Sequence, residues 1–186
     1  WKGLVGSEMC IRDRYDGFLQ SSLYQEIFCD DFLGQVPPID LKKEKQFHDF
    51  VMKLNDNEII NSAHDISDGG LLPCMIEMLL FNKLGIDINL PPRIQNPNEE
   101  NLLFLHGWLF GEDQSRIIIS TNKPDKLMEF SKSENIKIYC IGKTNNTGIV
   151  EIPKYDSICI NKCLDLYNNT IPVSYTHLTL PTMDSV

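Results

Sequence analysis

The sequence predicts one α/β domain, in which helices flank a layered, mixed sheet. Short apolar runs rich in β-branched residues alternate with segments of helical periodicity, and this alternation is typical of layered α/β folds. With 186 residues, the chain is long enough for one domain and short for two. No internal repeat, low-complexity tract or clear linker divides it, so we expect a single domain.

Composition narrows the classes of function. The chain is 42% hydrophobic and 23% charged, which is the ordinary globular range, and its net charge of −9 argues against nucleic-acid or anionic-membrane partners. No apolar run approaches the roughly 20 residues of a membrane span. The six cysteines form no CxxC pair, so they predict free thiols in a reducing cytoplasm, without a zinc or disulfide framework.

The first helix is expected within residues 20–29, QSSLYQEIFC. Ser21 or Ser22 is placed to cap its first turn, and Gln25 or Glu26 lies at the spacing of a capping box. The sequence therefore predicts where this short helix begins.

A second helix is expected from Asp40 to about Leu54, after a Pro-Pro loop at 30–38. Asp40 is its predicted N-cap. Its apolar residues recur at helical spacing and define one buried face: Phe47, Phe50, Val51 and Leu54.

The middle of the chain alternates strand and helix signals. Residues 58–64 fit a short buried strand, and a third helix opens at Leu71 with Pro73 in its first turn, where a missing N–H is tolerated. Residues 85–90 alternate as a strand does, and residues 99–110 form an apolar helix.

The C-terminal part continues the same alternation. Residues 115–121, SRIIIST, give the strongest strand signal, and Pro124 starts a helix that ends near Asn135. Two further strands and a last short helix are expected at 136–142, 148–152 and 160–169.

Both ends of the chain look foreign to the rest. EMCIRDR at 8–14 and VSYTHLTLPT at 173–182 resemble translated sequencing-adapter read-through, and neither shows a clear amphipathic period. We therefore expect 1–14 and 173–186 to be artefacts that lie outside the fold, and 15–172 to be the domain. On this interpretation, a larger protein precedes residue 15.

The first segment that could carry chemistry is HDISDGG at 64–70, between a predicted strand and a predicted helix. Its glycines allow close backbone approach, and free N–H groups at a helix start attract phosphate. Asp65 and Asp68 supply hard oxygen ligands that suit Mg²⁺ beside a phosphate. The alternative is a plain glycine turn, with Ser67 or Asp68 capping the helix.

The second such segment is LFGEDQSR at 109–116, which leads into the β-branched strand. Loops at strand ends commonly hold ligand contacts in α/β sheets. Glu112, Asp113 and Gln114 are candidates to accept from ribose hydroxyls or to coordinate a metal. The alternative is a polar turn in which Arg116 pairs with a carboxylate. We expect this loop and the 64–70 loop to lie together at one end of the sheet.

These two segments together carry a resemblance. AHDISDGGL at 63–71, followed by LFGEDQSRIIIS at 109–120, resembles the C-terminal domain of the formylglycinamidine ribonucleotide synthase family, in the large subunit of its bacterial multi-subunit type. QSSLYQEI, VPPIDLKKEKQFHDFV, LPCMIEML and IGKTNNTGIVEI resemble its other segments in order, so the likeness covers about 15–172. Either main motif alone is shared with the superfamily of aminoimidazole ribonucleotide synthase, whose C-terminal domain supplies the implied fold.

The resemblance implies the activity of the whole enzyme. Formylglycinamide ribonucleotide, ATP and glutamine-derived ammonia give formylglycinamidine ribonucleotide, ADP and phosphate, in purine biosynthesis. It implies Mg²⁺ and ATP as cofactors of the full enzyme. It also implies three partners in the cytoplasm: the rest of the synthase chain, a glutaminase subunit and a small accessory subunit.

The resemblance also implies roles for individual residues. The family enzyme is an internal duplication, and this chain is similar to its second C-terminal-type domain, so roles transfer by pseudo-symmetry. Asp65 resembles the metal aspartate, and six residues resemble a nucleotide or substrate lining: Asp68, Gly69, Gly70, Glu112, Asp113 and Gln114. Asp113 stands where the first copy usually has Ser, which counts against a ligand role. The family's catalytic histidine lies upstream, so we expect no catalytic residue here and no activity from this chain alone.

Two other functions remain open from the sequence. The chain fits another member of the superfamily, such as aminoimidazole ribonucleotide synthase, because either main motif alone is shared. It also fits a non-catalytic nucleotide-binding or scaffold module.

Overall fold

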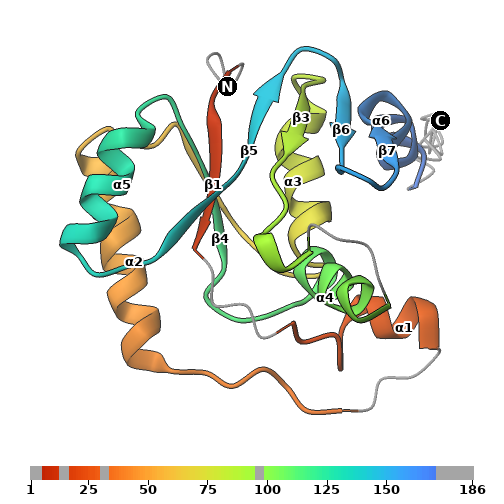
Figure 1. Cartoon of the computed structure of the whole chain (residues 1–186), viewed down its shortest axis with the longest axis horizontal. Helices are drawn as coiled ribbons and strands as arrows, with labels where there is room; N and C mark the ends of the chain where they lie inside the picture. The colour runs from red at the N-terminus through yellow and green to blue at the C-terminus, as the bar shows by residue number, and fades with distance from the viewer. Residues whose placement is uncertain (1–5, 13–16, 30–33, 95–98, 171–186) are drawn as a thin grey trace, which may run out of the picture.

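The fold is a three-layer α/β structure, as the alternating sequence pattern predicts (Figure 1). It is known from a computed structural model that describes residues 6–12, 17–29, 34–94 and 99–170. The helices are α1 Leu23–Cys29, α2 Leu41–Asp56, α3 Leu71–Leu80, α4 Glu99–Phe110, α5 Pro124–Ser133 and α6 Ile160–Asn169, with a short 3₁₀ helix at Pro92–Ile94. The strands are β1 Glu8–Arg12, β2 Ser62–Asp65, β3 Gly85–Ile88, β4 Ile117–Thr121, β5 Ile138–Asn145, β6 Ile149–Glu151 and β7 Ser157–Cys159.

One seven-stranded mixed sheet runs through the molecule, in the order β2-β4-β1-β5-β3-β6-β7. Strands β3 and β6 pair in parallel, and the other pairs that the structure describes are antiparallel. The fold class predicted from the sequence is therefore confirmed. All five predicted strands and all six predicted helices are present within a few residues of their expected bounds, whereas β1 and β7 were not predicted.

The two faces of the sheet are covered by different helices. One apolar cluster packs α3 and α4 against the sheet, with Leu79, Trp108 and Ile160 buried in it. The other packs α2 and α5 on the opposite face, with Phe47, Phe50 and Leu127 fully buried. These two clusters are the two sides of one sheet, so they do not define two domains (Figure 1).

The segment Glu8–Arg12 lies in the interior of the sheet, as the third of its seven strands. It forms β1, which pairs with β4 on one side and β5 on the other. Met9 and Ile11 belong to the α3–α4 cluster and Cys10 to the α2–α5 cluster, and each is at most 1% exposed. The expectation that residues 1–14 lie outside the fold is therefore wrong for this strand. The apolar MCI run fills both faces, as strands buried on two sides do.

That residues 8–14 derive from a sequencing adapter is not tested by their place in the sheet, and it stays a prediction. The other foreign-looking segment, 173–186, lies outside the described residues. Of the first foreign-looking segment, the structure describes residues 6–12, and these include an interior strand of the sheet.

Both predicted caps near the start of the chain are confirmed. The carboxylate of Asp40 accepts from the N–H groups of Lys42 and Lys43, both at 3.2 Å, and α2 begins at the next residue. At α1, Ser22 Oγ accepts from Gln25 N at 3.3 Å, while Gln25 Oε1 accepts from Ser21 N at 2.6 Å. This is the reciprocal pattern of a capping box, displaced by one residue on one side.

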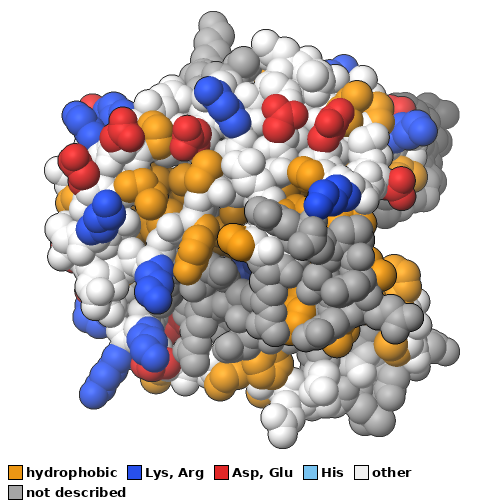
Figure 2. All heavy atoms as spheres, viewed as in Figure 1, with side chains coloured by type: hydrophobic (Ala, Val, Ile, Leu, Met, Phe, Trp, Pro, Cys, Tyr) orange, Lys and Arg blue, Asp and Glu red, His pale blue; other side chains and the backbone are white. Residues whose placement is uncertain are grey.

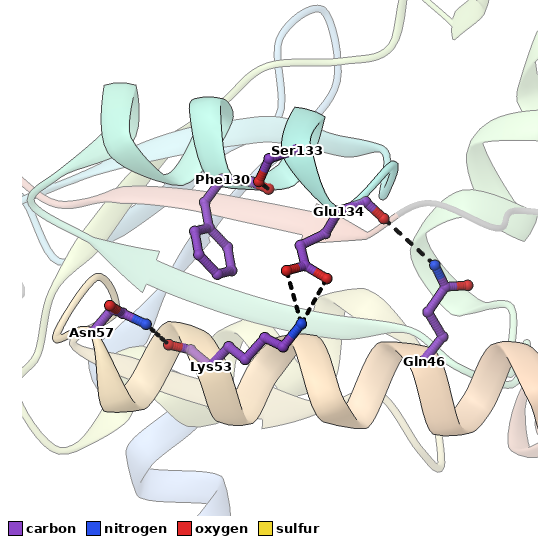
Figure 3. Close-up of polar contacts among 6 residues, drawn as sticks. All are labelled: Gln46, Lys53, Asn57, Phe130, Ser133 and Glu134. Carbon is purple, nitrogen blue, oxygen red and sulfur yellow. Dashed lines mark hydrogen bonds and ion pairs between the residues drawn. The ribbon is translucent and has the colours of Figure 1, made fainter.

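Helices α2 and α5 are also joined at their surface. Lys53 Nζ donates to both carboxylate oxygens of Glu134 at 2.8 Å, and Gln46 Nε2 donates to the Glu134 carbonyl at 3.5 Å (Figure 3). Below these polar contacts, Phe130 packs against Phe50 with a ring-centroid distance of 5.7 Å. The polar contacts therefore lie at the rim of a contact whose interior is apolar.

The surface carries mixed charge. Figure 2 shows acidic and basic side chains interspersed over the side formed by α2 and α5, with hydrophobic side chains exposed elsewhere on the same face. Helix α1 contributes to the exposed hydrophobic surface, because Ile27 and Phe28 are 65% and 69% exposed. Among the described residues, no helix is long and apolar enough to cross a membrane.

Candidate nucleotide-binding site

The glycine turn between β2 and α3 is built by backbone geometry. Gly69 and Gly70 both have φ of +81°, and Gly70 N–H donates to the Ser67 carbonyl at 3.0 Å. Glycine favours this left-handed region because it has no Cβ. Gly70 is the N-cap of α3, and no side chain caps that helix. The alternative in which Ser67 or Asp68 caps α3 is therefore not what the structure shows.

Arg116 anchors the second loop, between α4 and β4. Its side chain is fully buried, and it donates to the carbonyls of Gly111 at 2.9 Å and Trp108 at 3.0 Å. These carbonyls lie at the C-terminal end of α4, where helix carbonyls lack intrahelical partners. Arg116 NH1 also lies 3.8 Å from the buried carboxylate of Asp113. The polar-turn alternative is thus partly correct, because Arg116 does organise this loop.

Glu112 and Asp113 hold the segment that precedes α1. Asp113 accepts from the N–H groups of Gly17 at 3.2 Å and Phe18 at 3.3 Å, and Glu112 N–H donates to the Phe18 carbonyl at 3.0 Å. The Glu112 carboxylate accepts from Leu23 N–H at 2.9 Å. Two of the three tripeptide side chains therefore bind the protein's own backbone.

The two predicted loops meet, as expected. Gly69 N–H donates to Glu112 Oε1 at 2.8 Å, and Ile66 N–H donates to the Arg116 carbonyl at 2.9 Å. The contact joins residues 43 positions apart. The prediction that the loops lie together at one end of the sheet is confirmed.

A cavity of about 710 Å³ opens beside this junction. Of the predicted site residues, four line it: Asp65, Asp68, Glu112 and Gln114. Gly69, Gly70 and Asp113 do not line the cavity, and Asp113 is 4% exposed. The structure therefore separates the tripeptide, placing Glu112 and Gln114 at the cavity and Asp113 outside its lining.

An apolar lip completes the cavity and was not predicted as part of it. Val36, Pro37 and Ile39 line one side, and Val36 and Ile39 are 75% and 63% exposed. The sequence showed this segment only as a Pro-rich loop. Exposed apolar residues in a loop just before a capped helix are the signal that could have marked it.

The cavity carries more negative than positive charge. Glu44, Asp65, Asp68 and Glu112 supply carboxylates, whereas the guanidinium of Arg116 is engaged by the α4 carbonyls. Clustered carboxylates repel unless a cation, a donor or solvent lies between them. An anionic ligand would therefore need to bring a cation with it.

His64 and Cys74 form a small polar pair beside the Asp65 carbonyl. Cys74 Sγ lies 3.3 Å from His64 Nδ1 and donates to the Asp65 carbonyl at 3.4 Å. Burial, followed by the charges of Glu77 and Asp65, raises the pKa of the Cys74 thiol to about 12. Cys74 is therefore neutral at pH 7 and unsuited to act as a nucleophile.

The described residues do not form a metal centre by themselves. They contain no group of three or more His, Cys, Asp or Glu side chains that could hold a metal ion. Asp65, the predicted metal ligand, has a side chain that is 80% exposed. Magnesium bound here would take most of its ligands from phosphate and water, which is its usual mode at nucleotide sites.

Comparison with known proteins identifies the family. A family model described as AIR synthase related protein, C-terminal domain, matches residues 10–153. The chain belongs to this family. The match begins inside β1, so the AIR synthase related C-terminal domain includes most of the sheet described above.

Eight curated relatives of this AIR synthase related domain carry the same name. The phosphoribosylformylglycinamidine synthase subunit PurL of Azorhizobium caulinodans is 29% identical over 171 residues, which is 91% of this chain and 22% of the relative. A PurL subunit of Rhodopseudomonas palustris is 35% identical over 130 residues, covering 69% of this chain and 17% of the relative. The chain thus spans about a fifth of the length of these relatives.

Solved structures show the same fold. PurL of Thermotoga maritima complexed with FGAR superposes with a TM-score of 0.64 at 16% identity, covering 86% of this chain and 28% of that one. The same protein complexed with ATP gives a TM-score of 0.62 at 15% identity, covering 86% and 26%. Because the sequence identity is only 15–16%, these superpositions show a shared fold and nothing further.

Proposed function

We propose that the chain is the C-terminal domain of a phosphoribosylformylglycinamidine synthase. The observation that carries this proposal is the 29% identity to a PurL subunit over 91% of the chain. The whole enzyme would convert formylglycinamide ribonucleotide, ATP and glutamine-derived ammonia into formylglycinamidine ribonucleotide, ADP and phosphate. It would act in cytoplasmic purine biosynthesis as an ATP-dependent C–N ligase.

Within that enzyme, the domain would contribute one wall of a nucleotide cleft. A phosphate would be held at the cavity through Mg²⁺, because the N–H groups of Gly69 and Gly70 already donate to Glu112 Oε1 and to the Ser67 carbonyl. Gln114 lines the cavity as an exposed amide, and Val36, Pro37 and Ile39 offer apolar contacts for a base or ribose. These features support the nucleotide class without assigning a catalytic residue to this chain.

The proposed nucleotide would bind together with Mg²⁺. The carboxylates of Asp65 and Asp68 line the cavity, and their repulsion of phosphate would be offset by a divalent cation between them. Asp65 is the proposed metal ligand because its side chain is exposed and adjoins the glycine turn.

The partners follow from the same proposal. The rest of the synthase chain would complete the cleft, since this chain spans about a fifth of its relatives. A solved neighbour is the PurLQS assembly of Thermotoga maritima, with a TM-score of 0.59 and 15% identity. We propose a glutaminase subunit and a small accessory subunit as the corresponding partners, and we expect the isolated chain to be inactive.

A domain exchange tests the proposal. Residues 8–170, which include β1, would replace the matching part of the Azorhizobium caulinodans subunit, and the product of substrate, ATP and ammonia would be measured. Formation of formylglycinamidine ribonucleotide by a folded chimera supports the proposal. Failure there, with activity when the domain is placed in an aminoimidazole ribonucleotide synthase, would favour the superfamily alternative. Inactivity in both folded hosts would favour a scaffold module.

A further inference from the structure

One carboxylate oxygen of Glu112 joins two elements that border the cavity. Oε1 accepts from Leu23 N–H, the first residue of α1, at 2.9 Å, and from Gly69 N–H, in the glycine turn, at 2.8 Å. The two donors come from segments far apart in the sequence, and a Cβ built on Gly69 would lie 3.7 Å from Leu23 Cδ2. The start of α1 and the glycine turn are therefore in contact around this carboxylate.

The N–H groups of Leu23 and Gly69 both lie near helix starts, where backbone donors lack intrahelical acceptors. The first N–H groups of a helix have no intrahelical carbonyl to donate to, and a negative charge at that end is favourable. Gly69 immediately precedes the N-cap of α3, a helix that has no side-chain cap of its own. Glu112 therefore supplies, from another loop, an acceptor for both N–H groups, in addition to the local cap that Ser22 gives α1.

The neighbouring contacts keep Glu112 in place. Its N–H donates to the Phe18 carbonyl at 3.0 Å, and adjacent Asp113 accepts from the N–H groups of Gly17 and Phe18. The carboxylate is thus attached to a loop that is itself bonded to the chain entering α1. A ligand that used Oε1 would have to displace two backbone donors.

We propose that Glu112 is a positioning residue that sets the glycine turn against α1 at the edge of the cavity. It is not the carboxylate that contacts the bound nucleotide. Gln114, whose side chain lines the same cavity, is the tripeptide member left to reach a ligand. This inference rests on the proposed function for its ligand, but its structural half can be measured without one.

The test compares variants that separate the charge of Glu112 from its bonds. E112Q keeps an acceptor oxygen without the charge, and E112A removes both. Leu23→Pro keeps the carboxylate and removes one donor at the first helical position, where proline is tolerated. Leu23→Ala, which keeps the N–H, is its matched control. Amide hydrogen exchange and Mg–ADP titration are measured on the whole chain.

A positioning role predicts a specific pattern. E112A speeds exchange at Leu23 and Gly69 by about tenfold, as expected for loss of a charge-assisted bond, while E112Q changes it much less. Mg–ADP affinity falls in both E112A and Leu23→Pro, and the two losses are not additive. Gln114→Ala lowers affinity without changing either exchange rate.

Three results would overturn the proposal. The first is unchanged exchange at both amides in E112A. The second is E112Q losing as much affinity as E112A while both amides stay protected. The third is Leu23→Pro binding Mg–ADP as the Leu23→Ala control does while E112A does not. If the parent chain alone binds no Mg–ADP, the titrations are made in the chimeric subunit, where the rest of the synthase completes the cleft, and the exchange rates still decide whether Glu112 positions the turn.

Discussion

A Cβ atom placed on Gly70 would lie 2.5 Å from the carbonyl carbon of Phe110. The N-cap of α3 therefore lies directly against the backbone at the end of α4, and the two helices meet without a side chain between them. This contact fixes the glycine turn from one side, and Glu112 holds it from the other.

Gly70→Ala should destabilise the fold more than Gly69→Ala. Both residues have φ of +81°, and Gly70 has ψ of −153°, a region that glycine alone adopts readily, so its substitution adds backbone strain of about 1–3 kcal/mol. At Gly69 the nearest obstacle is the ring of Pro73 at 3.0 Å, whereas at Gly70 it is backbone that cannot turn aside. We expect about 1–3 kcal/mol more for Gly70→Ala from this overlap, measured by urea unfolding. Equal losses for the two variants would contradict the close contact.

Ile11→Ala should be costly, because β1 is an interior strand. Ile11 is 1% exposed, and removing such a side chain typically costs about 2–5 kcal/mol. Ile27→Ala is the matched control, since Ile27 is 65% exposed and should change the free energy of unfolding by less than about 0.5 kcal/mol. Similar values for both variants would mean that β1 does not occupy the interior of the sheet.

The reactivity of the Cys140 thiol should depend on Cys10 in β1. It faces Cys10 across the β1–β5 pair, and the hydrogen bond from Cys10 is the main reason that the pKa of Cys140 falls to about 7. Its thiolate should therefore form as the pH rises through about 7. Cys10→Ala should slow alkylation of Cys140 at pH 7 by roughly tenfold, because the lowered pKa is lost.

Cys10→Ser is the control for that experiment. A hydroxyl retains a donor at the same position, so it should preserve most of the reactivity of Cys140. Rates would be followed by mass spectrometry of the modified peptide. If Cys10→Ala leaves the pH profile of Cys140 unchanged, the two thiols are not paired.

Asp65→Asn combined with Asp68→Asn should weaken Mg–ADP binding without loss of stability. Neither side chain caps α3, so the free energy of unfolding should change by less than about 0.5 kcal/mol. The affinity should fall because two carboxylates near the proposed Mg²⁺ are gone. Calorimetric titration and urea unfolding of the same variant give both numbers. Lower stability with unchanged affinity would restore the capping interpretation.

The Lys53–Glu134 pair should contribute little to stability. Its side chains are 50% and 30% exposed, and pairs of this kind are worth about 0.2–1 kcal/mol. A double-mutant cycle with Lys53→Met and Glu134→Gln should give a coupling energy in that range that decreases with added salt. A cycle on Lys45 and Asp49, which are 78% and 56% exposed, is the control and should give less. A coupling above about 2 kcal/mol would show that the contact is more than a rim interaction.

Elements with local signals could be predicted from the sequence. Asp40 marks the start of α2 because its side chain bonds to the next turn, and the apolar run at 99–110 matches α4 in both bounds. Strand β1 could not be predicted this way, because MCI is continuous and shows no period. Strand β7 is three residues long, too short to carry a pattern.

The sequence predicted where the candidate site lies, but it did not predict which contacts each of its residues makes. The two loops were expected together, since loops at strand ends gather at one edge of a sheet. The partners of Glu112 and Asp113 are backbone N–H groups of distant segments, and no side-chain pattern reveals such bonds. Sequence reasoning therefore identified the tripeptide and did not foresee that part of it holds the chain itself.

The interior position of β1 has a consequence for how the protein is made. Within the domain, this strand leaves the ribosome well before its partners, which are residues 118–121 and 138–143. Until those are synthesised, Met9, Cys10 and Ile11 have no strand to pair with, and unpaired apolar strands are prone to associate between chains. The sheet can close only after most of the domain has emerged. Folding of the domain should therefore be slow and late, and β1 should be the part of the nascent domain most in need of a chaperone.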